Sequence, residues 1–282
     1  MSVLRVSAIS FLNTAPLMWD FERGEAGNDF EISYTIPSKC AAALASGTAD
    51  MGIIPAVSYA QIPGLVILPN IAIAAKDRVR SILLISKKSM EDVRTVATDT
   101  SSRTSVALTQ VLFAKFFGGH REFTPHSPDV KEMLKEHDAA LLIGDSALQI
   151  SMHDSRYHLY DLAHDWRRLT GKPFVFAFWA IRLDRLQRQP EGLNLREVFQ
   201  KSRDHGLLPE NVAMLAEAWA PKLGITEAEV TGYLTENIDY FLDRENHAGL
   251  QLFLSYAHEI GLIPAVPELR FLGPVAFCGG PK

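Results

Sequence analysis

A short polar turn near the start of the chain carries the first side chain with clear chemical use, the amide of Asn13. It lies in SAISFLNTAPL, Ser7 to Leu17, directly after an apolar run that contains Leu4 and Val6. Such runs favour buried strands, and ligands of open α/β sheets bind beyond the carboxyl ends of strands. An amide donates and accepts hydrogen bonds but is no general base at neutral pH. The turn therefore predicts either a ligand-orienting amide or a turn that satisfies only its own backbone.

Hydroxyl side chains gather at a second place, the predicted helix start in TDTSSRTSVAL, Thr98 to Leu108. Unpaired amide hydrogens at a helix start attract anions, and hydroxyl donors beside them add to that attraction. Simple N-capping by Ser101 or Ser102 needs only one hydroxyl. The surplus favours a carboxylate or phosphate site that includes Ser102, Thr104 and Ser105.

Two further polar pairs flank apolar runs. Arg80 and Ser81 precede ILLIS, and Gly144 and Asp145 follow AALLI. If the chain crosses between two lobes just after ILLIS, the first pair lies near the cleft; a solvated arginine at a strand start is the other interpretation. Glycine permits close approach of a ligand, and Asp145 either orients a substrate hydroxyl or caps the next helix.

Nucleophilic and metal chemistry have little support in the sequence. GDSAL at 144–148, with Asp161 and His164, has the residue types of a serine esterase. In such esterases, however, the GDS block lies near the N-terminus and the Asp/His pair near the C-terminus, whereas both are mid-chain here. The nine histidines are scattered without metal-ligand spacing, and neither a Walker loop nor G-x-G-x-x-G occurs. We therefore expect neither an esterase nor a bound metal.

The composition is that of an ordinary globular protein. The 282 residues, 47% hydrophobic and 22% charged, suffice for one large domain or two medium ones. A net charge of −5 provides no field that would attract nucleic acid or an anionic membrane. Cys40 and Cys278 lie far apart, which fits neither a zinc pattern nor a disulfide framework. With no visible secretory signal or membrane span, we expect a cytoplasmic protein without nucleic-acid or membrane partners.

The candidate residues require elements that bring them together, and the hydrophobic pattern predicts two α/β units. In the first, short apolar runs alternate with helical patterns such as PSKCAAALAS, where Ser38 is the expected N-cap and Gly47 the stop. This alternation implies a mostly parallel sheet. A second series begins near Asp92. From about 183 the chain is helical, with a capping box at Thr226 and Glu229 and a long amphipathic stretch to 258.

The two units predict an α/β protein of two lobes with a ligand cleft between them. We expect residues 1–90 to form the first part of lobe 1, residues 91–175 to form lobe 2, and residues 176–282 to return to lobe 1 with the C-terminal helices. The aromatic run KPFVFAFWA is predicted to be a buried strand, with Phe176 or Trp179 as candidate walls of the cleft. One continuous doubly wound sheet is the alternative that periodicity leaves open.

Six segments, taken in order, resemble the chorismate dehydratases of the futalosine-dependent menaquinone pathway. They are SFLNTAPL, IPSKCAAALASGTADMGIIP, VRSILLIS, SSRTSVAL, LLIGDSAL and DWRRLTGKPFVFAFWA, and they cover most of residues 3–182. The resemblance implies a two-lobed fold similar to type II periplasmic binding proteins. A sister enzyme, dihydroxynaphthoate synthase, shares that fold but typically opens with a motif of the kind SPCPNDT, where this chain has SAISFLNTAPL.

The resemblance also implies a reaction, the loss of water from chorismate to give 3-[(1-carboxyvinyl)oxy]benzoate without a cofactor. Asn13 would be the catalytic residue, orienting the leaving hydroxyl or the enolpyruvyl carboxylate. The proton acceptor would then be the substrate's own side-chain carboxylate. Substrate binding is assigned to polar side chains: Ser81, Ser102, Thr104 and Ser105 for the two carboxylates, and Ser10 and Asp145 for hydroxyl contacts. A dihydroxynaphthoate synthase-like enzyme and a non-catalytic small-anion-binding protein are the alternatives, and the oligomeric state is left open.

Overall fold

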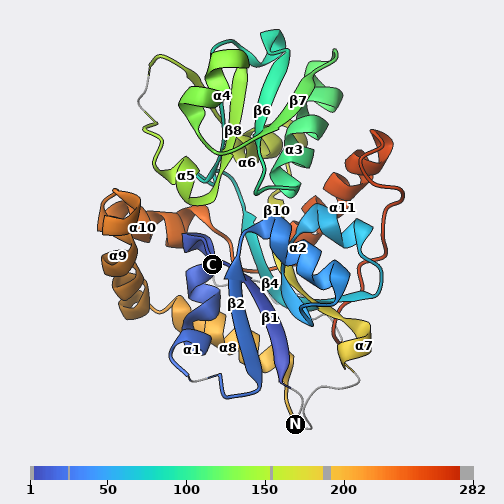
Figure 1. Ribbon diagram of the computed structural model, residues 1–282, viewed down its shortest axis with the longest axis vertical. Helices are drawn as coiled ribbons and strands as arrows, with labels where there is room; N and C mark the ends of the chain where they lie inside the picture. Colours follow the sequence, from blue (N-terminus) through green and yellow to red (C-terminus); the bar gives the residue numbers. More distant parts are fainter. Residues whose placement is uncertain (1–2, 25, 153–154, 187–191, 274–282) are drawn as a thin grey trace.

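Two five-stranded sheets, each the centre of one lobe, make up the computed structural model, which describes residues 3–24, 26–152, 155–186 and 192–273 (Figure 1). The first sheet has the order β2-β1-β3-β10-β4, with β1 Leu4–Ile9, β2 Phe30–Thr35, β3 Met51–Pro55, β4 Leu65–Ala75 and β10 Phe174–Arg182. The second has the order β7-β6-β8-β5-β9, with β5 Ile82–Ser86, β6 Thr95–Asp99, β7 Glu122–His126, β8 Ala139–Ile143 and β9 His158–Asp161. The predicted two-lobed α/β architecture is confirmed, and a single continuous sheet is excluded.

Both sheets are mixed, although the sequence pattern predicted mostly parallel pairing. In the first, β1 is parallel to β2 and β3, while β10 is antiparallel to β3 and β4. In the second, β6 is parallel to β7 and β8, while β5 is antiparallel to β8 and β9. β5 is the first strand after the chain crosses into the second lobe, and β10 is the first strand after the chain returns to the first lobe. They start at the boundary between lobes, so they run opposite to strands that end there.

The chain crosses between the lobes twice, after Ala75 to reach β5 and after α6 to reach β10. The second sheet therefore begins at Ile82, earlier than the sequence-based boundary near residue 90. All five residues of β5 are buried, so both faces of the strand are covered. Such a run does not reveal which of two sheets it joins.

The helix after β2 shows how local sequence places one boundary of the cleft. Helix α2 spans Pro37–Ser46 and ends at Gly47 in the left-handed conformation, φ 75°, as predicted. The expected N-cap is wrong: Pro37 occupies the first turn, and Ile36 is the cap residue without a side-chain bond. Ser38 instead donates its backbone N–H to the Ser101 carbonyl oxygen in the other lobe, at 3.1 Å.

The remaining helices cover the two sheets (Figure 1). They are α1 Trp19–Glu22, α3 Thr104–Leu112, α4 Val130–Glu136, α5 Gly144–Leu148, α6 Leu162–Thr170, α7 Leu183–Leu186, α8 Leu195–Gly206, α9 Pro209–Leu223, α10 Glu227–Gly232 and α11 Arg244–Glu259. None of the described helices is long and apolar enough to span a membrane. Strand β10 is buried as predicted, and its Trp179 ring lies 4.8 Å from the Phe199 ring of α8.

The C-terminal stretch predicted as one long amphipathic pattern is divided. The capping box of Thr226 and Glu229 is present and starts α10, but a π-helical turn, Tyr233–Asn237, follows it. The chain then extends alongside β4, where Asp239 and Ala74 exchange backbone hydrogen bonds of 2.8 and 2.9 Å. This pairing interrupts the helix, and α11 starts anew with Asp243 as its N-cap.

Candidate functional site

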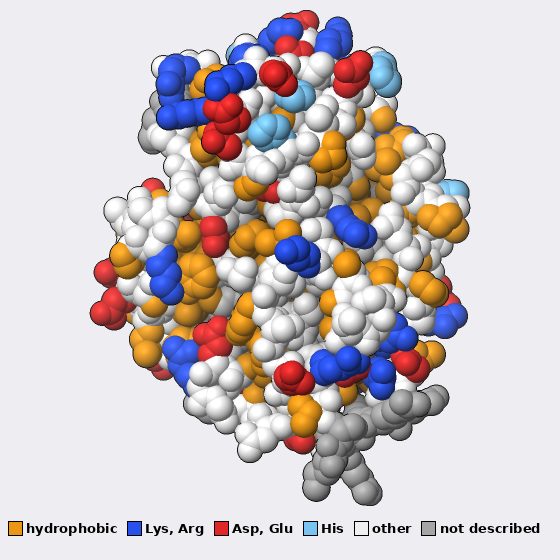
Figure 2. Space-filling view, in the orientation of Figure 1, with side chains coloured by type: hydrophobic (Ala, Val, Ile, Leu, Met, Phe, Trp, Pro, Cys, Tyr) orange, Lys and Arg blue, Asp and Glu red, His pale blue; other side chains and the backbone are white. Residues whose placement is uncertain are grey.

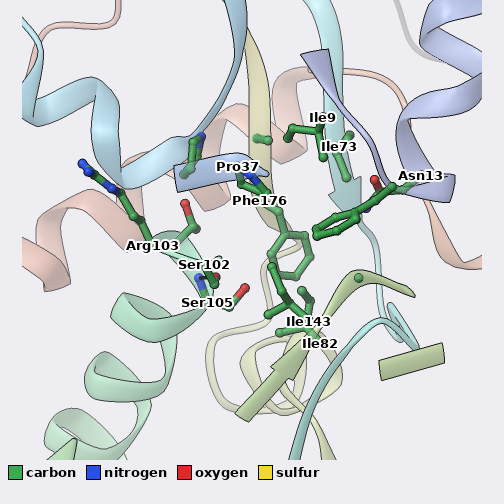
Figure 3. A pocket seen from close by; sticks show the side chains of 15 residues that line it. Ile9, Asn13, Pro37, Ile73, Ile82, Ser102, Arg103, Ser105, Ile143 and Phe176 are labelled. Atoms are coloured by element: carbon green, nitrogen blue, oxygen red, sulfur yellow. Dashed lines mark hydrogen bonds between the residues drawn. The ribbon is translucent and has the colours of Figure 1, made fainter. Parts of the chain in front are cut away.

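A pocket lies between the lobes, where strand ends of both sheets meet (Figure 3). Its walls are mainly apolar and come from the ends of β1, β3 and β8, the start of β5, and the interiors of β4 and β10: Ile9, Pro55, Ile143, Ile82, Ile73, Phe176 and Ala177. Phe176 was one of two candidate wall residues, and it lines the pocket. Trp179, the other, is fully buried against α8 instead.

Polar groups stand on opposite sides of this apolar space. Ser102 and Ser105, at the start of α3, lie on one side of Phe176, and Asn13 lies on the other (Figure 3). Thr104 also lines the pocket. A ligand with hydrogen-bonding groups at two ends and an apolar middle fits this distribution. Four residues of the predicted set are thus brought together.

The hydroxyls at the start of α3 also have structural roles. The Ser105 backbone N–H donates to Ser102 Oγ at 3.2 Å, and the Val57 backbone N–H, from the first lobe, donates to Thr104 Oγ1 at 3.3 Å. A hydroxyl oxygen that accepts such a bond keeps its own hydrogen for another acceptor. The capping interpretation and the ligand interpretation of this segment are therefore compatible.

Asn13 follows β1 in a short 3₁₀ segment, Leu12–Met18, whose preceding residue Phe11 is extended. The Thr14 hydroxyl donates to Asn13 Oδ1 at 3.3 Å. An amide oxygen can accept two hydrogen bonds, so this oxygen and the amide N–H groups can each bind a further partner.

The turn that carries Asn13 is bonded to the second lobe. The Leu12 backbone N–H donates to Oδ1 of Asp145, in α5, at 3.0 Å. Asp145 itself is outside the set of residues that line the pocket, one position after Gly144, which belongs to it. Burial raises the pKa of the Asp145 carboxyl to about 6, although the bond from Leu12 acts in the opposite direction.

The raised pKa of Asp145 predicts a pH-dependent stability. Because its folded-state pKa of about 6 exceeds the ordinary 3.8, the folded chain binds the proton more tightly, and this contribution is present below about pH 4 and lost as pH rises through 6. Asp145→Asn keeps an oxygen acceptor for Leu12 but cannot ionise. From pH 4 to pH 7 the wild type should therefore lose up to about 3 kcal/mol of its free energy of unfolding relative to Asp145→Asn. Urea unfolding at both pH values measures this, and a difference independent of pH would contradict it.

Beside the bond from Leu12 to Asp145, the backbone of Gly144 in the second lobe packs closely against the Phe11 ring of the first lobe. Gly144 has φ +58°, and a Cβ built on it would lie 2.7 Å from Cδ2 and 2.8 Å from Cε2 of Phe11. Both residues line the pocket. Only glycine allows the ring to approach so closely at this backbone angle. The sequence predicted close approach of a ligand at Gly144; the structure places the Phe11 side chain of the opposite lobe there.

Ser81 and Ser10 are placed away from the pocket lining. Ser81 is fully buried, one residue before the lining residue Ile82, and its Oγ accepts a 2.8 Å hydrogen bond from the Tyr233 hydroxyl. Ser10 donates to the Thr35 carbonyl oxygen at 3.3 Å and faces a separate hollow beside Trp219.

Sequence reasoning missed Tyr233 and left Arg103 out of the predicted site. Tyr233 is 152 positions from Ser81 and has no motif around it. Arg103 was visible among the hydroxyls of the α3 start and lines the pocket. Its exposed side chain extends away from Phe176 in Figure 3, which places its charge at the rim.

The residue types that suggested an esterase have structural partners. Asp161 caps α6 by accepting from the N–H groups of Ala163 and His164, and it also accepts from those of Val79 and Arg80. The His164 ring forms a hydrogen bond with the Asp77 carboxyl at 2.6 Å.

Arg80, which the sequence placed near the cleft if the chain crosses there, has φ +62° and lines a separate hollow with Leu148 and Glu229, away from the pocket.

Charges are mixed on the face of the molecule seen in Figure 2, where the described Lys and Arg side chains alternate with Asp and Glu. No group of three or more His, Cys, Asp or Glu among the described residues is placed to hold a metal ion. Cys40 is buried, and Cys278 lies outside the described residues. This pocket offers a ligand hydrogen-bonding groups, apolar walls and the Arg103 charge at its rim.

Comparisons with known proteins agree with this geometry. A family model described as menaquinone biosynthesis matches residues 4–259. A chorismate dehydratase from Thermus thermophilus is 29% identical over 268 residues, which cover 89% of this chain and 93% of that protein. These findings confirm the resemblance stated above.

Solved structures show the fold. A protein from Archaeoglobus fulgidus has a TM-score of 0.71 at 18% identity, with 92% of this chain and 98% of that one covered. The periplasmic aliphatic sulphonate binding protein from Escherichia coli has a TM-score of 0.67 at 15% identity, with 100% and 96% covered. The chain therefore has the two-lobed fold of periplasmic binding proteins.

Proposed function

The chain belongs to the menaquinone-biosynthesis family, and from this premise we propose that it is a chorismate dehydratase. The reaction removes the ring hydrogen from the ether-bearing carbon of chorismate and expels the hydroxyl of the neighbouring carbon. One water leaves, the ring becomes aromatic, and the enolpyruvyl ether stays intact. The product is 3-[(1-carboxyvinyl)oxy]benzoate.

The observation that carries the proposal is the distribution of polar groups around the pocket, in a chain 29% identical to a chorismate dehydratase. Chorismate has a carboxylate on its ring, a second on its side chain, and an apolar ring face between them. Ser102 and Ser105 at the start of α3 suit one carboxylate, and Asn13 on the opposite side suits the hydroxyl or the second carboxylate (Figure 3). The apolar walls around Phe176 suit the ring.

In this proposal the protein contributes positioning more than proton transfer. Asn13 donates an amide N–H to the leaving hydroxyl or the enolpyruvyl carboxylate. The enolpyruvyl carboxylate, held above the ring, takes the ring proton. Bonds between the lobes, from Leu12 to Asp145 and from Val57 to Thr104, keep the pocket closed. Exclusion of water strengthens each of these hydrogen bonds during the reaction.

Substitution of Ser102, at the start of α3, distinguishes a helix-capping role from a role in substrate binding. Ser102→Ala is expected to raise the KM for chorismate about tenfold, because it removes a hydrogen bond to a carboxylate. Thr226→Ala is the matched control, since Thr226 likewise accepts an N-terminal N–H of its helix, at 3.2 Å, but outside the pocket. Both variants should unfold at lower temperature, with KM raised only in the first. An unchanged KM for Ser102→Ala, or an equal rise in both, would remove Ser102 from the site.

The function is tested by incubating the purified chain with chorismate and separating the products by chromatography with mass spectrometry. Product that has lost one water but retains both carboxylates supports the dehydratase. Chorismate that binds and is recovered intact supports a small-anion-binding protein. A cytoplasmic location and the absence of nucleic-acid and membrane partners belong to the same proposal.

A further inference from the structure

We propose that Arg103 is a specificity-determining residue of this site, whose positive charge at the pocket rim favours ligands that carry two carboxylates. The inference rests on the proposed function and adds to it the means by which the site distinguishes dianions from monoanions. Among the described residues that line the pocket, Arg103 is the one with a charged side chain. Figure 3 shows it beside Ser102 and Ser105, on their side of the pocket.

The Arg103 side chain has no structural partner. It is exposed, and no hydrogen bond or ion pair joins it to another residue in the part of the chain that the structure describes. Other cations of the chain are paired, as Arg5 is with Asp50 at 2.7 Å and Lys76 with Asp243 at 2.6 Å. An unpaired guanidinium keeps both its field and its donors for a ligand.

Helix stability does not explain an arginine at this position. Arg103 is the N-cap residue of α3 and makes no side-chain capping bond. A helix start carries partial positive charge, so acidic residues stabilise it and basic residues oppose it. The first turns of α4, α6 and α8 accordingly contain Glu132, Asp165 and Glu197, whereas the first turn of α3 contains no acidic residue. A bound anion would balance the positive charge at the start of α3.

The start of α2 brings a second unpaired cation to the same region from the other lobe. Its first turn also lacks an acidic residue, and its Pro37 lines the pocket. Lys39, in that turn, is exposed and forms no hydrogen bond or ion pair with another described residue. Ser38 donates its N–H to the Ser101 carbonyl oxygen at 3.1 Å and its hydroxyl to that of Thr100 at 3.3 Å. Two helix starts thus give the pocket a positive surrounding in a chain of net charge −5.

A charge at the rim distinguishes ligands by their own charge. The Coulomb energy is proportional to the charge of the ligand, so a dianion such as chorismate gains more than a monoanion of the same shape. The exposed position of Arg103 means that it acts through its charge and not through a fixed two-point contact, so lysine can replace it. Dissolved salt screens such an interaction.

The test compares two stable probes by calorimetry, the dianion 3-(carboxymethoxy)benzoate and the monoanion 3-methoxybenzoate. At about 0.01 M ionic strength, where the Debye length is about 30 Å, Arg103→Gln should weaken binding of the dianion about tenfold and of the monoanion about threefold. At about 1 M both losses should fall below about twofold. Arg103→Lys should bind the dianion within about threefold of the wild type.

Lys131→Gln is the matched control, because it changes the net charge by the same amount. Lys131 is exposed on α4 of the same lobe and lies outside the pocket lining. Its loss of affinity for either probe should stay within about twofold. Thermal unfolding establishes that each variant is folded, and Arg103→Gln should not unfold at a lower temperature, because it removes a cation from a helix start.

Three results would overturn the inference. These are equal losses of affinity for the two probes, an equal loss in Lys131→Gln, and binding of the dianion by Arg103→Lys no tighter than by Arg103→Gln. A wild-type protein that binds neither probe would overturn it as well. Turnover is measured separately: chorismate left intact by the wild type refutes the proposed dehydratase, whereas the comparison of probes decides the role of Arg103.

Discussion

Asn13→Ala is expected to lower kcat for chorismate dehydration by about 100- to 1000-fold, while the affinity for chorismate changes only a few fold. The amide is the polar group on its side of the pocket, opposite Ser102 and Ser105 (Figure 3). Its donor bond to the substrate matters most as charge develops on the leaving oxygen. The start of α3 and the apolar walls, which supply most of the binding, remain intact.

The measurement compares steady-state kinetics with chorismate binding by calorimetry, for the wild type and the variant. Thr14→Val serves as the control, because it removes the hydroxyl on the Asn13 oxygen but leaves the amide in place. Its loss of kcat should be much smaller than that of Asn13→Ala. Turnover by Asn13→Ala at the wild-type rate would exclude Asn13 from the mechanism, and loss of binding alone would make it a substrate-binding residue only.

Gly144→Ala is expected to lower kcat/KM about 30- to 100-fold by opposing closure of the lobes. The new Cβ would lie 2.7 Å from the Phe11 ring in the opposite lobe, and the backbone angle of +58° is unfavourable for alanine. The angle alone costs about 1 to 2 kcal/mol. The clash is present only when the lobes are together, so it acts against the closed form.

Gly171→Ala separates the two effects. Gly171 also has a positive φ, +71°, but nothing lies within 4 Å of the added Cβ. It should lose stability comparable to the backbone cost and keep kcat/KM within about twofold. Phe11→Leu combined with Gly144→Ala should restore part of the activity, since it removes the ring atoms that the Cβ meets. Equal losses in Gly144→Ala and Gly171→Ala would show that closure is not the step affected.

Local features of the sequence predicted the elements well where a motif specifies them. Gly47 ends α2, the Thr226 and Glu229 capping box starts α10, and the aromatic run of β10 is a buried strand. Ser38 shows the limit of this reasoning, because Pro37 took the first turn and the serine bonded the other lobe. The division of the C-terminal stretch also followed from a distant partner, the edge of β4.

The candidate site, too, could be predicted where a local motif marks a residue, and not where a contact between distant residues decides. Asn13 and the hydroxyls at the α3 start were predicted because each lies at a strand end or a helix start, and the structure brings them to one pocket. The bond from Leu12 to Asp145 and the contact of Phe11 with Gly144 depend on how two lobes meet. Tyr233 reaches Ser81 over 152 positions. No local pattern carries such information, so these residues required the structure.

The most direct test of this account is the conversion of chorismate by the purified wild-type chain, with Asn13→Ala measured beside it under the same conditions. Mass spectrometry of the separated products identifies whether water has been lost. The account predicts that the wild type forms 3-[(1-carboxyvinyl)oxy]benzoate and that Asn13→Ala binds chorismate but leaves nearly all of it unconverted. Wild-type protein that returns chorismate intact would contradict it.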